Sequence, residues 1–295
     1  MRKASSVAAV VLIALIAPAP ASAWGFTAHR LIMARAIDLL PPELKPFFDH
    51  FRQETVIRVV DPDLWRNAGW EDEPNHFVDF GLPSLGPPPF AGLPRDYTQA
   101  VEKFGVAEMK RIGTLPWREA EMFGHLRRGF ESFTRQGQYA TTDVVLFSAV
   151  ASHYIQDANQ PFHATNNYDG QLTGNTGIHA RFERDLIERF QSRLMLVPET
   201  PKAIRNPRDA AFDALLEGHT QVDAILKADT QAAIGKDVYD DDYFEKLFAA
   251  VKPILERQLS RSITATAGVI TGAWEAAGRP VLSTQDARPP QKVRK

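Results

Sequence analysis

Residues 153–183 read HYIQDANQPFHATNNYDGQLTGNTGIHARFE. This stretch holds three histidines, and two of them are followed four residues later by a carboxylate. On a helix this spacing places both side chains of a pair on one face, about one turn apart. Pro161 indicates that the helix with the first pair ends before the histidine between the pairs. The candidate ligands are His153, Asp157, His163, His179 and Glu183.

Imidazole nitrogen and carboxylate oxygen together suit zinc better than calcium or magnesium, which prefer oxygen ligands alone. A single pair of this kind is common on a solvated helix face. Two pairs with a further histidine in the connecting loop are much rarer and predict a metal site. Five ligands exceed the needs of one four-coordinate zinc, so we expect more than one metal ion or further ligands elsewhere in the chain.

The first 23 of the 295 residues have the features of a secretory signal peptide. A basic head of Arg2 and Lys3 precedes an apolar run too short to span a bilayer, and residues 21–23 form a small-residue cleavage site. We therefore expect an exported protein, periplasmic or secreted, whose mature chain begins at Trp24. One large domain is expected over residues 24–278, followed by a disordered tail at 279–295.

The composition limits the partners of the mature chain. The whole sequence has a net charge of -2, and the predicted signal peptide contains only two charges, both positive, so the mature part is near -4. This balance argues against a broadly basic nucleic-acid surface, but it allows a small anionic substrate drawn to bound cations. No cysteine is present, so disulfides are excluded. No second apolar run is long enough for a transmembrane segment, and no stable protein partner is implied.

Helical periodicity recurs along the chain and predicts an all-α fold, a single multi-helix domain. We find no glycine-rich phosphate loop and no alternating strand pattern. His125 is expected on the surface and His219 in a structural role. The predicted helices cover residues 29–51 with a break at Pro41-Pro42, 98–111, 116–135, 141–157 with a cap at Thr141 or Thr142, 179–194, 208–228, 240–257 and 261–277.

Two further segments hold candidate ligands. The free amine of Trp24 would titrate near neutrality and could bind a metal, and His29 lies within reach of the same ion. Residues 59–80 are rich in acids and turn residues, with little periodicity. Their candidate ligands are Asp61, Asp63 and His76, whereas Glu71, Asp72 and Glu73 are expected to form a solvated acidic turn.

These motifs, in this order, resemble the zinc-dependent phospholipase C family and the related single-strand-specific zinc nucleases. The resemblance covers nearly the whole mature chain. It is carried by HYIQDANQPFHA at 153–164, IHARFE at 178–183, NHFVD at 75–79 and the predicted mature start at Trp24. The family implies an α-helical domain with three zinc ions in a cleft.

By similarity, each zinc ion has its own ligand set. The first would be held by Asp63, His76, His153 and Asp157, the second by His163, His179 and Glu183, and the third by Trp24, His29 and a bridging Asp157. Asp63 fits the family better than Asp61, because Arg66 follows it by three residues. The resemblance also implies catalytic roles for Asp157, which joins two metals, and for Asp63 as a proton acceptor.

The resemblance implies a zinc-dependent phosphodiesterase that uses a metal-bound hydroxide. Glu183, where the nucleases carry aspartate, favours phospholipase C activity, whereas the short spacing from Trp24 to His29 is closer to the nucleases. A phospholipase would need apolar loop tips, for which Leu82, Leu85, Phe90 and Leu93 in the Pro/Gly-rich loop at 81–97 are candidates. The alternative, a single-strand-specific nuclease and 3'-nucleotidase, would need aromatic platforms, for which Trp65 or Trp70 could serve. A third reading is a non-catalytic zinc-binding protein with saturated metal sites.

Overall fold

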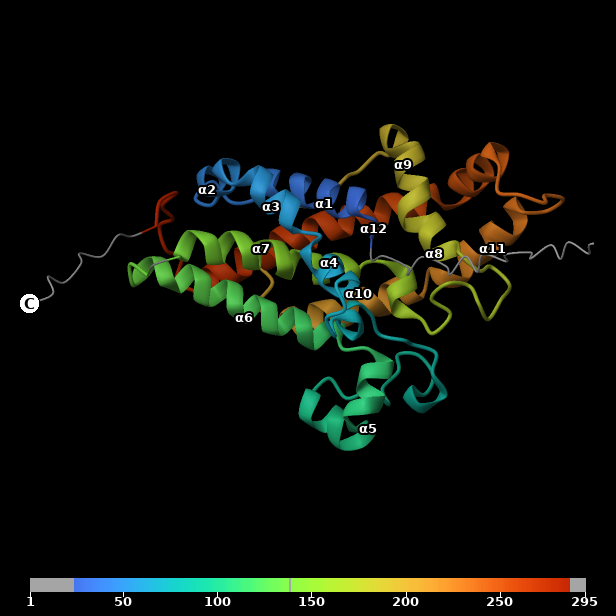
Figure 1. The fold of residues 1–295 in the computed structure, drawn as a ribbon, viewed down its shortest axis with the longest axis horizontal. Helices are drawn as coiled ribbons and strands as arrows, with labels where there is room; N and C mark the ends of the chain where they lie inside the picture. Colours follow the sequence, from blue (N-terminus) through green and yellow to red (C-terminus); the bar gives the residue numbers. More distant parts are fainter. Residues whose placement is uncertain (1–23, 138, 287–295) are drawn as a thin grey trace, which may run out of the picture.

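The longest helix, α12 (Asp241–Ala276), extends along the molecule, and three other long helices pack against it in the computed structural model (Figure 1). These are α1 (Phe26–Asp38), α6 (Leu115–Thr134) and α7 (Ala140–Asp157). The structure describes residues 24–137 and 139–286, and within these ranges it contains helices, turns and loops but no strand. The predicted all-α fold is therefore confirmed.

Shorter elements complete the domain around this frame. They are α2 (Lys45–His50), α3 (Arg52–Arg58), α4 (Asp61–Asn67), α5 (Tyr97–Ile112), α8 (Ile178–Ala180), α9 (Leu186–Phe190), α10 (Pro207–His219) and α11 (Val222–Ala232). Four 3₁₀ turns lie at Glu73–His76, Pro83–Leu85, Pro161–Ala164 and Gln191–Arg193, and a π-helical turn covers Arg181–Asp185.

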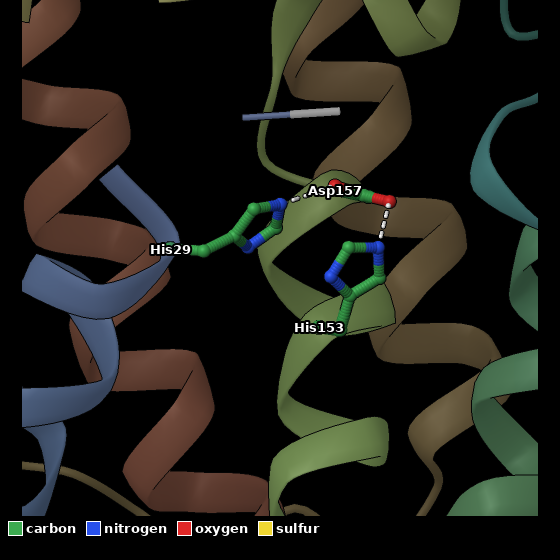
Figure 2. A group of neighbouring side chains, drawn as sticks. All are labelled: His29, His153 and Asp157. Atoms are coloured by element: carbon green, nitrogen blue, oxygen red, sulfur yellow. Dashed lines mark ion pairs between the residues drawn. The ribbon is translucent and has the colours of Figure 1, made fainter. Parts of the chain in front are cut away.

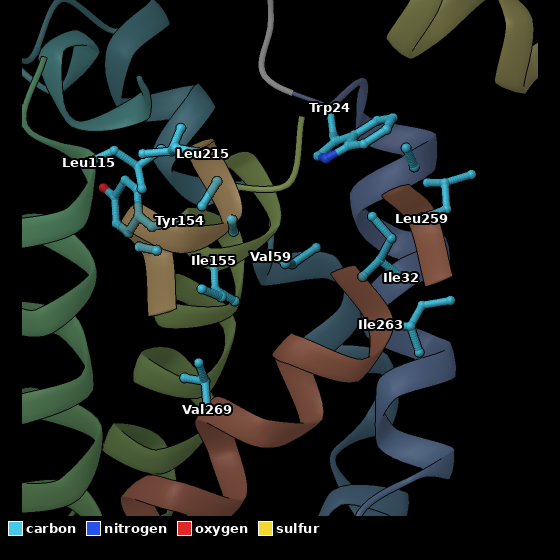
Figure 3. Close-up of a cluster of buried hydrophobic side chains, with 14 of the residues drawn as sticks. Trp24, Ile32, Val59, Leu115, Tyr154, Ile155, Leu215, Leu259, Ile263 and Val269 are labelled. Carbon is cyan, nitrogen blue, oxygen red and sulfur yellow. The ribbon is translucent and has the colours of Figure 1, made fainter. Parts of the chain in front are cut away.

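One continuous apolar core joins these helices. α12 buries Leu255, Leu259 and Ile263 at four-residue intervals, a spacing that aligns side chains on one helix face. Trp24 and Ile32 lie in the same cluster (Figure 3). The indole Nε1 of Trp24 donates a 2.8 Å hydrogen bond to the carbonyl oxygen of Gln156 near the end of α7. The first described residue is thus fixed beside the C-terminal end of α7.

Several predicted helix boundaries agree with the structure, and others differ for local reasons. The segments predicted at 240–257 and 261–277 form the single helix α12, because Leu259 and Ser262 continue its buried face across the expected break. The helix predicted at 208–228 is instead divided into α10 and α11. There Thr220 Oγ1 donates to the carbonyl of Glu217 at 2.7 Å, a side-chain bond that competes with helix continuation.

The start of α7 also differs from the prediction, because neither Thr141 nor Thr142 caps it with a side chain. The backbone N–H of Thr141 instead donates to the Asp286 carboxylate at 2.7 Å. Asp286 belongs to the predicted disordered tail, of which residues 279–286 are described and 287–295 are not. The predicted signal peptide at 1–23 also lies outside the described residues.

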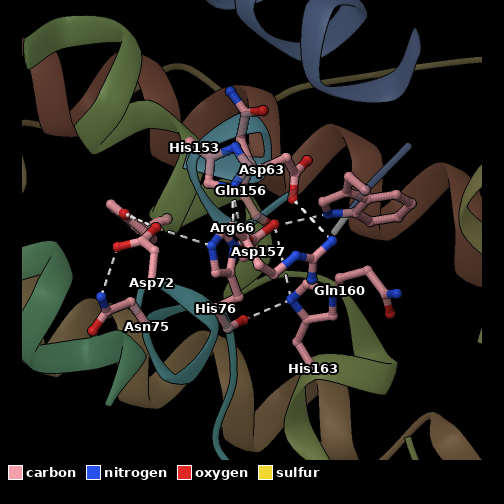
Figure 4. A network of polar contacts seen from close by, with 12 residues as sticks. Asp63, Arg66, Asp72, Asn75, His76, His153, Gln156, Asp157, Gln160 and His163 are labelled. Carbon is pink, nitrogen blue, oxygen red and sulfur yellow. Dashed lines mark hydrogen bonds and ion pairs between the residues drawn. The ribbon is translucent and has the colours of Figure 1, made fainter. Parts of the chain in front are cut away.

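The segment at 59–80 contains a helix that its weak periodicity does not predict. α4 begins at Asp61 with Pro62 in its first turn, an arrangement that favours helix starts. This helix carries Asp63 and Arg66 into the interior (Figure 4). None of the helices in the described ranges is both long enough and apolar enough to cross a membrane.

Candidate metal centre

Three groups of buried side chains could each hold a metal ion. Within each group the potential ligand atoms lie within 4.8 Å of one another. The groups are His29, His153 and Asp157; Asp63, His76 and His153; and His163, His179 and Glu183. All of the predicted ligands except Trp24 belong to one of these groups. The three groups are adjacent, since His153 is shared by two and His163 Nδ1 lies 3.8 Å from Asp157 Oδ1.

The first two groups form where the C-terminal end of α7 meets other segments. α7 supplies His153 and Asp157, while α1 supplies His29 (Figure 2). The Asp157 carboxylate lies between the two groups. Its Oδ1 is 3.3 Å from His29 Nε2, and its Oδ2 is 3.2 Å from His153 Nε2 and 2.9 Å from His76 Nδ1. A carboxylate in this position can serve two ions.

The third group is built on a turn and an irregular helix. His163 lies in the 3₁₀ turn after α7, and His179 lies in α8. Glu183 follows in the π-helical turn, with its Oε2 2.9 Å from His179 Nε2. Single π-helical turns of this kind are frequent at functional sites. Gln160 Nε2 donates to the same Glu183 oxygen at 2.8 Å and fixes the carboxylate.

Backbone pairing connects the third group to the rest of the cluster. His163 Nδ1 lies 2.7 Å from the carbonyl oxygen of His76, and the N–H of Val78 donates to the carbonyl of His163 at 2.9 Å. The N–H of Asn166 then donates to the carbonyl of Phe80 at 2.8 Å. Segments 76–80 and 163–166 therefore run side by side, which fixes the positions of two of the groups relative to each other.

Four histidines each direct one ring nitrogen into the cluster and place the other against an acceptor outside it. The outer partners are Gln156 Oε1 for His29 at 2.6 Å, the Val59 carbonyl for His153 at 2.8 Å, the His76 carbonyl for His163 at 2.7 Å and Asp72 Oδ2 for His76 at 3.1 Å. Outer acceptors of this kind set the tautomer of metal-bound histidine. With the proton on the outer nitrogen, the inner nitrogen has a lone pair for a cation; in His76 the inner Nδ1 lies 2.9 Å from Asp157 Oδ2, and a proton held there would have to leave first.

The side chains of the cluster fit a metal ion, because some of the ring nitrogens and carboxylate oxygens that face its interior form no hydrogen bond. His29 Nε2 and Asp157 Oδ1 are buried and form no hydrogen bond among the described residues; they face each other at an ion-pair distance of 3.3 Å. Buried polar atoms are rarely left without a partner, since their desolvation is costly. A cation between them would satisfy both, and the mixture of imidazole and carboxylate suits zinc.

The charges of the cluster follow from its burial. Burial alone would raise the pKa of Asp157, but the surrounding histidines lower that pKa well below its usual range. Burial lowers the pKa of His163, which keeps this imidazole neutral. Burial also lowers the pKa of His76, but hydrogen bonds to Asp157 and Asp72 outweigh it and raise this pKa to about 9. Metal binding to His76 must therefore displace a proton.

Trp24 lies next to the group that contains His29. Its indole is bonded to the backbone of Gln156, and the side chain of the same Gln156 contacts His29 Nδ1 at 2.6 Å. The start of the predicted mature chain is therefore connected to the cluster through one residue. That the Trp24 amine is itself a ligand remains a prediction.

The structure distinguishes the two candidate aspartates of α4. Asp63 is buried and belongs to a metal group, whereas Asp61 is partly exposed and pairs with Arg58 at 3.3 Å. Arg66, one turn after Asp63, enters the same interior, and its Nη2 is 3.5 Å from Asp63 Oδ1 (Figure 4). Its Nε and Nη2 are buried without a hydrogen-bond partner. The resemblance named Arg66 only to distinguish Asp63 from Asp61, although the spacing of three residues places Arg66 and Asp63 on the same helix face.

The prediction that Asp72 lies in a solvated turn is wrong, because the residue is only 5% exposed. Besides His76, its carboxylate accepts hydrogen bonds from Tyr154 Oη at 2.8 Å and Asn75 Nδ2 at 2.8 Å. Burial would raise the pKa of Asp72, but the hydrogen bonds, led by that from His76, lower it to about 2. The neighbouring Glu71 and Glu73 are exposed as predicted.

The remaining candidates lie outside the three groups. His125 is partly exposed and stacks on Phe147, with ring centroids 4.8 Å apart, and His219 Nδ1 lies 2.7 Å from the carbonyl oxygen of Ala164. Trp65 and Trp70 stack on each other with centroids 5.9 Å apart, and Trp70 is 65% exposed.

Comparison of the chain with protein-family models and with curated proteins gives no match.

Proposed function

We propose that this protein is a zinc-dependent hydrolase of phosphodiesters, of the phospholipase C type. The supporting observation is the juxtaposition of three buried histidine–carboxylate groups with the guanidinium of Arg66. A phosphodiester is anionic, and nucleophilic attack adds charge to it in the transition state. Bound zinc would supply the general chemistry, by lowering the pKa of a water to near 7 and by neutralising developing charge.

The residues of the chain have separate tasks in this proposal. Arg66 has two guanidinium nitrogens without hydrogen-bond partners and can donate them to phosphate oxygens. Asp63 stands beside Arg66 and can accept a proton from the attacking water. Asp157 holds two metal groups at a fixed separation. The third group offers three protein ligands, so a tetrahedral ion there would keep one position for substrate.

The expected route to a lipid surface needs correction. The loop at 81–94 was the candidate for apolar tips, but Leu85 is 0%, Phe90 4% and Leu93 5% exposed, and Leu82 is partly buried. These side chains fill the core, and Phe90 stacks on Phe80 with ring centroids 4.6 Å apart. A phospholipid would have to be recognised without this loop, so the phospholipase proposal rests on the residues of the metal cluster.

One observation favours a single-strand-specific nuclease as the second candidate. The stacked Trp65 and Trp70 form an aromatic platform, and they flank Arg66 in the sequence. An exposed indole can stack on any base, which gives affinity without sequence preference. A non-catalytic zinc protein is less well supported, since saturated sites would leave no reason for buried guanidinium nitrogens at Arg66 that form no hydrogen bond within the described ranges, with only the 3.5 Å ion pair to Asp63.

A paired assay tests these alternatives on purified protein that begins at Trp24, with metal content determined on the same sample. One arm offers phosphatidylcholine vesicles and the other single-stranded DNA or RNA, each with and without a chelator. Chelator-sensitive release of diacylglycerol alone supports the phospholipase. Cleavage of nucleic acid alone makes the protein a nuclease. Bound zinc without either activity would contradict both, and absence of bound metal would overturn the proposal as a whole.

A further inference from the structure

Asp72 is the one outer partner of the four inward-directed histidines that carries a charged side chain. The others are an amide oxygen and two backbone carbonyls, whereas His76 Nε2 faces the Asp72 carboxylate at 3.1 Å. The geometry of His76 is also reversed. His29, His153 and His163 use Nδ1 for the outer contact, and His76 alone uses Nε2 and turns Nδ1 towards Asp157.

The Asp72 carboxylate is itself held from three directions. Tyr154 Oη donates to Oδ2 at 2.8 Å, and Asn75 Nδ2 donates to Oδ1 at 2.8 Å. Arg118 Nη2 reaches Oδ1 at 3.3 Å, while its Nε contacts the Tyr154 hydroxyl at 3.3 Å. These partners come from α6, α7 and the 3₁₀ turn, so Asp72 has one available orientation.

We propose that Asp72 is a positioning residue that keeps the proton of His76 on Nε2 and so presents Nδ1 to the metal. The inference rests on the proposed metal site and deepens it. A carboxylate that accepts from a ligating imidazole fixes the ring orientation and increases the basicity of the inner nitrogen. Asp72 itself is too far out to bind the ion, because the His76 ring stands between it and the group formed with Asp63 and His153.

The neighbouring Glu73 provides a control that separates positioning from general electrostatics. Glu73 is the next residue and also carries a negative charge, but its side chain is exposed, whereas the Asp72 carboxylate is buried against His76 Nε2. If only charge mattered, neutralising either residue would weaken metal binding to a similar extent. If positioning matters, only the change at Asp72 should do so.

The experiment compares Asp72→Asn with Glu73→Gln on the full mature protein. Zinc affinity is measured by competition with a chelator of known affinity, and circular dichroism checks folding. Loss of an outer-shell partner typically weakens metal binding by about 10–100-fold. We expect a loss of this size for one ion in Asp72→Asn, with less than about twofold change in Glu73→Gln and no change at the group of His163, His179 and Glu183. Equal losses in both variants, or none in Asp72→Asn, would overturn the inference.

A second measurement needs no variant. Long-range ¹H–¹⁵N correlation spectra of the zinc-loaded wild-type protein report which nitrogen of each histidine carries the proton. We expect His76 to carry it on Nε2, and His29, His153 and His163 to carry it on Nδ1. A His76 bound through Nε2 would refute the positioning role even if Asp72→Asn does not fold.

The outcomes separate this inference from the proposed function. Zinc binding that depends on Asp72, without phosphodiester hydrolysis, would contradict the proposed function and leave the positioning role intact. Hydrolysis with unchanged zinc affinity in Asp72→Asn would support the proposed function and contradict the positioning role. A wild-type protein that binds no zinc would overturn both.

Discussion

Asp157→Asn tests the central feature of the cluster, a carboxylate placed between two metal groups. The substitution preserves the shape of the side chain but replaces one oxygen by an amide nitrogen, which donates hydrogen bonds and has no lone pair for a metal. Whichever way the amide turns, one metal-binding oxygen is lost. Oδ1 faces the group of His29 at 3.3 Å, and Oδ2 faces the group of His76 at 2.9 Å. The negative charge that both ions would share is also removed.

The expected size of the effect follows from this position. Loss of an outer-shell partner weakens metal binding by about 10–100-fold, so loss of a shared ligand should cost each ion at least the upper value, or about 2.7 kcal/mol. The group of His163, His179 and Glu183 does not include Asp157. We therefore expect zinc content to fall from three ions per chain to one, with hydrolysis lost.

The assay is elemental analysis after dialysis against buffered free zinc, followed by activity measurements on the same samples. The one remaining ion shows that the variant is folded. Asp61→Asn is the matched control, because Asp61 lies on α4 near the cluster but pairs with Arg58 and belongs to no metal group. Three retained ions and full activity in Asp157→Asn would refute the bridging assignment.

Three further changes have defined outcomes. Arg66→Ala should lower kcat/KM by at least tenfold with zinc content unchanged, since its guanidinium is assigned to phosphate; reduced zinc content would instead make Arg66 structural. Burial raises the pKa of Glu119 well above its usual 4.5, so the folded protein keeps a proton that the unfolded chain loses. The contribution of Glu119 to the free energy of unfolding should therefore fall by about 1.4 kcal/mol per pH unit, from the unfolded-state pKa up to the folded-state pKa. Denaturant unfolding between about pH 5 and 7 should show the stability difference between the wild type and Glu119→Gln falling at this rate, whereas the difference between the wild type and the exposed control Glu102→Gln stays constant; a constant difference for Glu119→Gln would contradict the prediction. Protein that retains residues 1–23 should bind one zinc fewer and be inactive, because the Trp24 nitrogen is then an amide; an active, fully metallated precursor would exclude the amine as a ligand.

Much of the candidate metal cluster could be predicted because its proposed ligands follow local rules. His153 and Asp157 are one helical turn apart, so their common face follows from sequence spacing alone. Asp63 and His76 were candidates by residue type, and the resemblance assigned them to the same ion as His153 and Asp157, which are distant in the sequence. The fold class followed in the same way, from apolar periodicity that is repeated in each long helix.

The features that were missed depend on contacts between distant segments. Asp72 belongs to a run of three acids and has the local pattern of a solvated turn, but its burial is set by Tyr154 and Arg118, which lie 82 and 46 residues away. The Pro/Gly-rich loop at 81–97 likewise has the composition of an exposed loop, and only its packing against Phe80 and His219 buries Phe90. Composition predicts that a segment is irregular, whereas its exposure depends on what covers it.

The charge distribution also bears on the choice of substrate. If each group holds one divalent ion, six positive charges face three carboxylates, and Arg66 adds one more, so the site carries a net charge of about +4. The whole chain carries -2. Attraction for phosphate is therefore confined to the cluster, and the rest of the surface offers little to a long polyanion. A zwitterionic phospholipid needs no more than this one site.

If nucleic acid is cleaved instead, few phosphates are contacted, and log affinity should fall with log salt with a slope of about -1 to -2. A slope near -6 would require a basic surface that this composition does not provide.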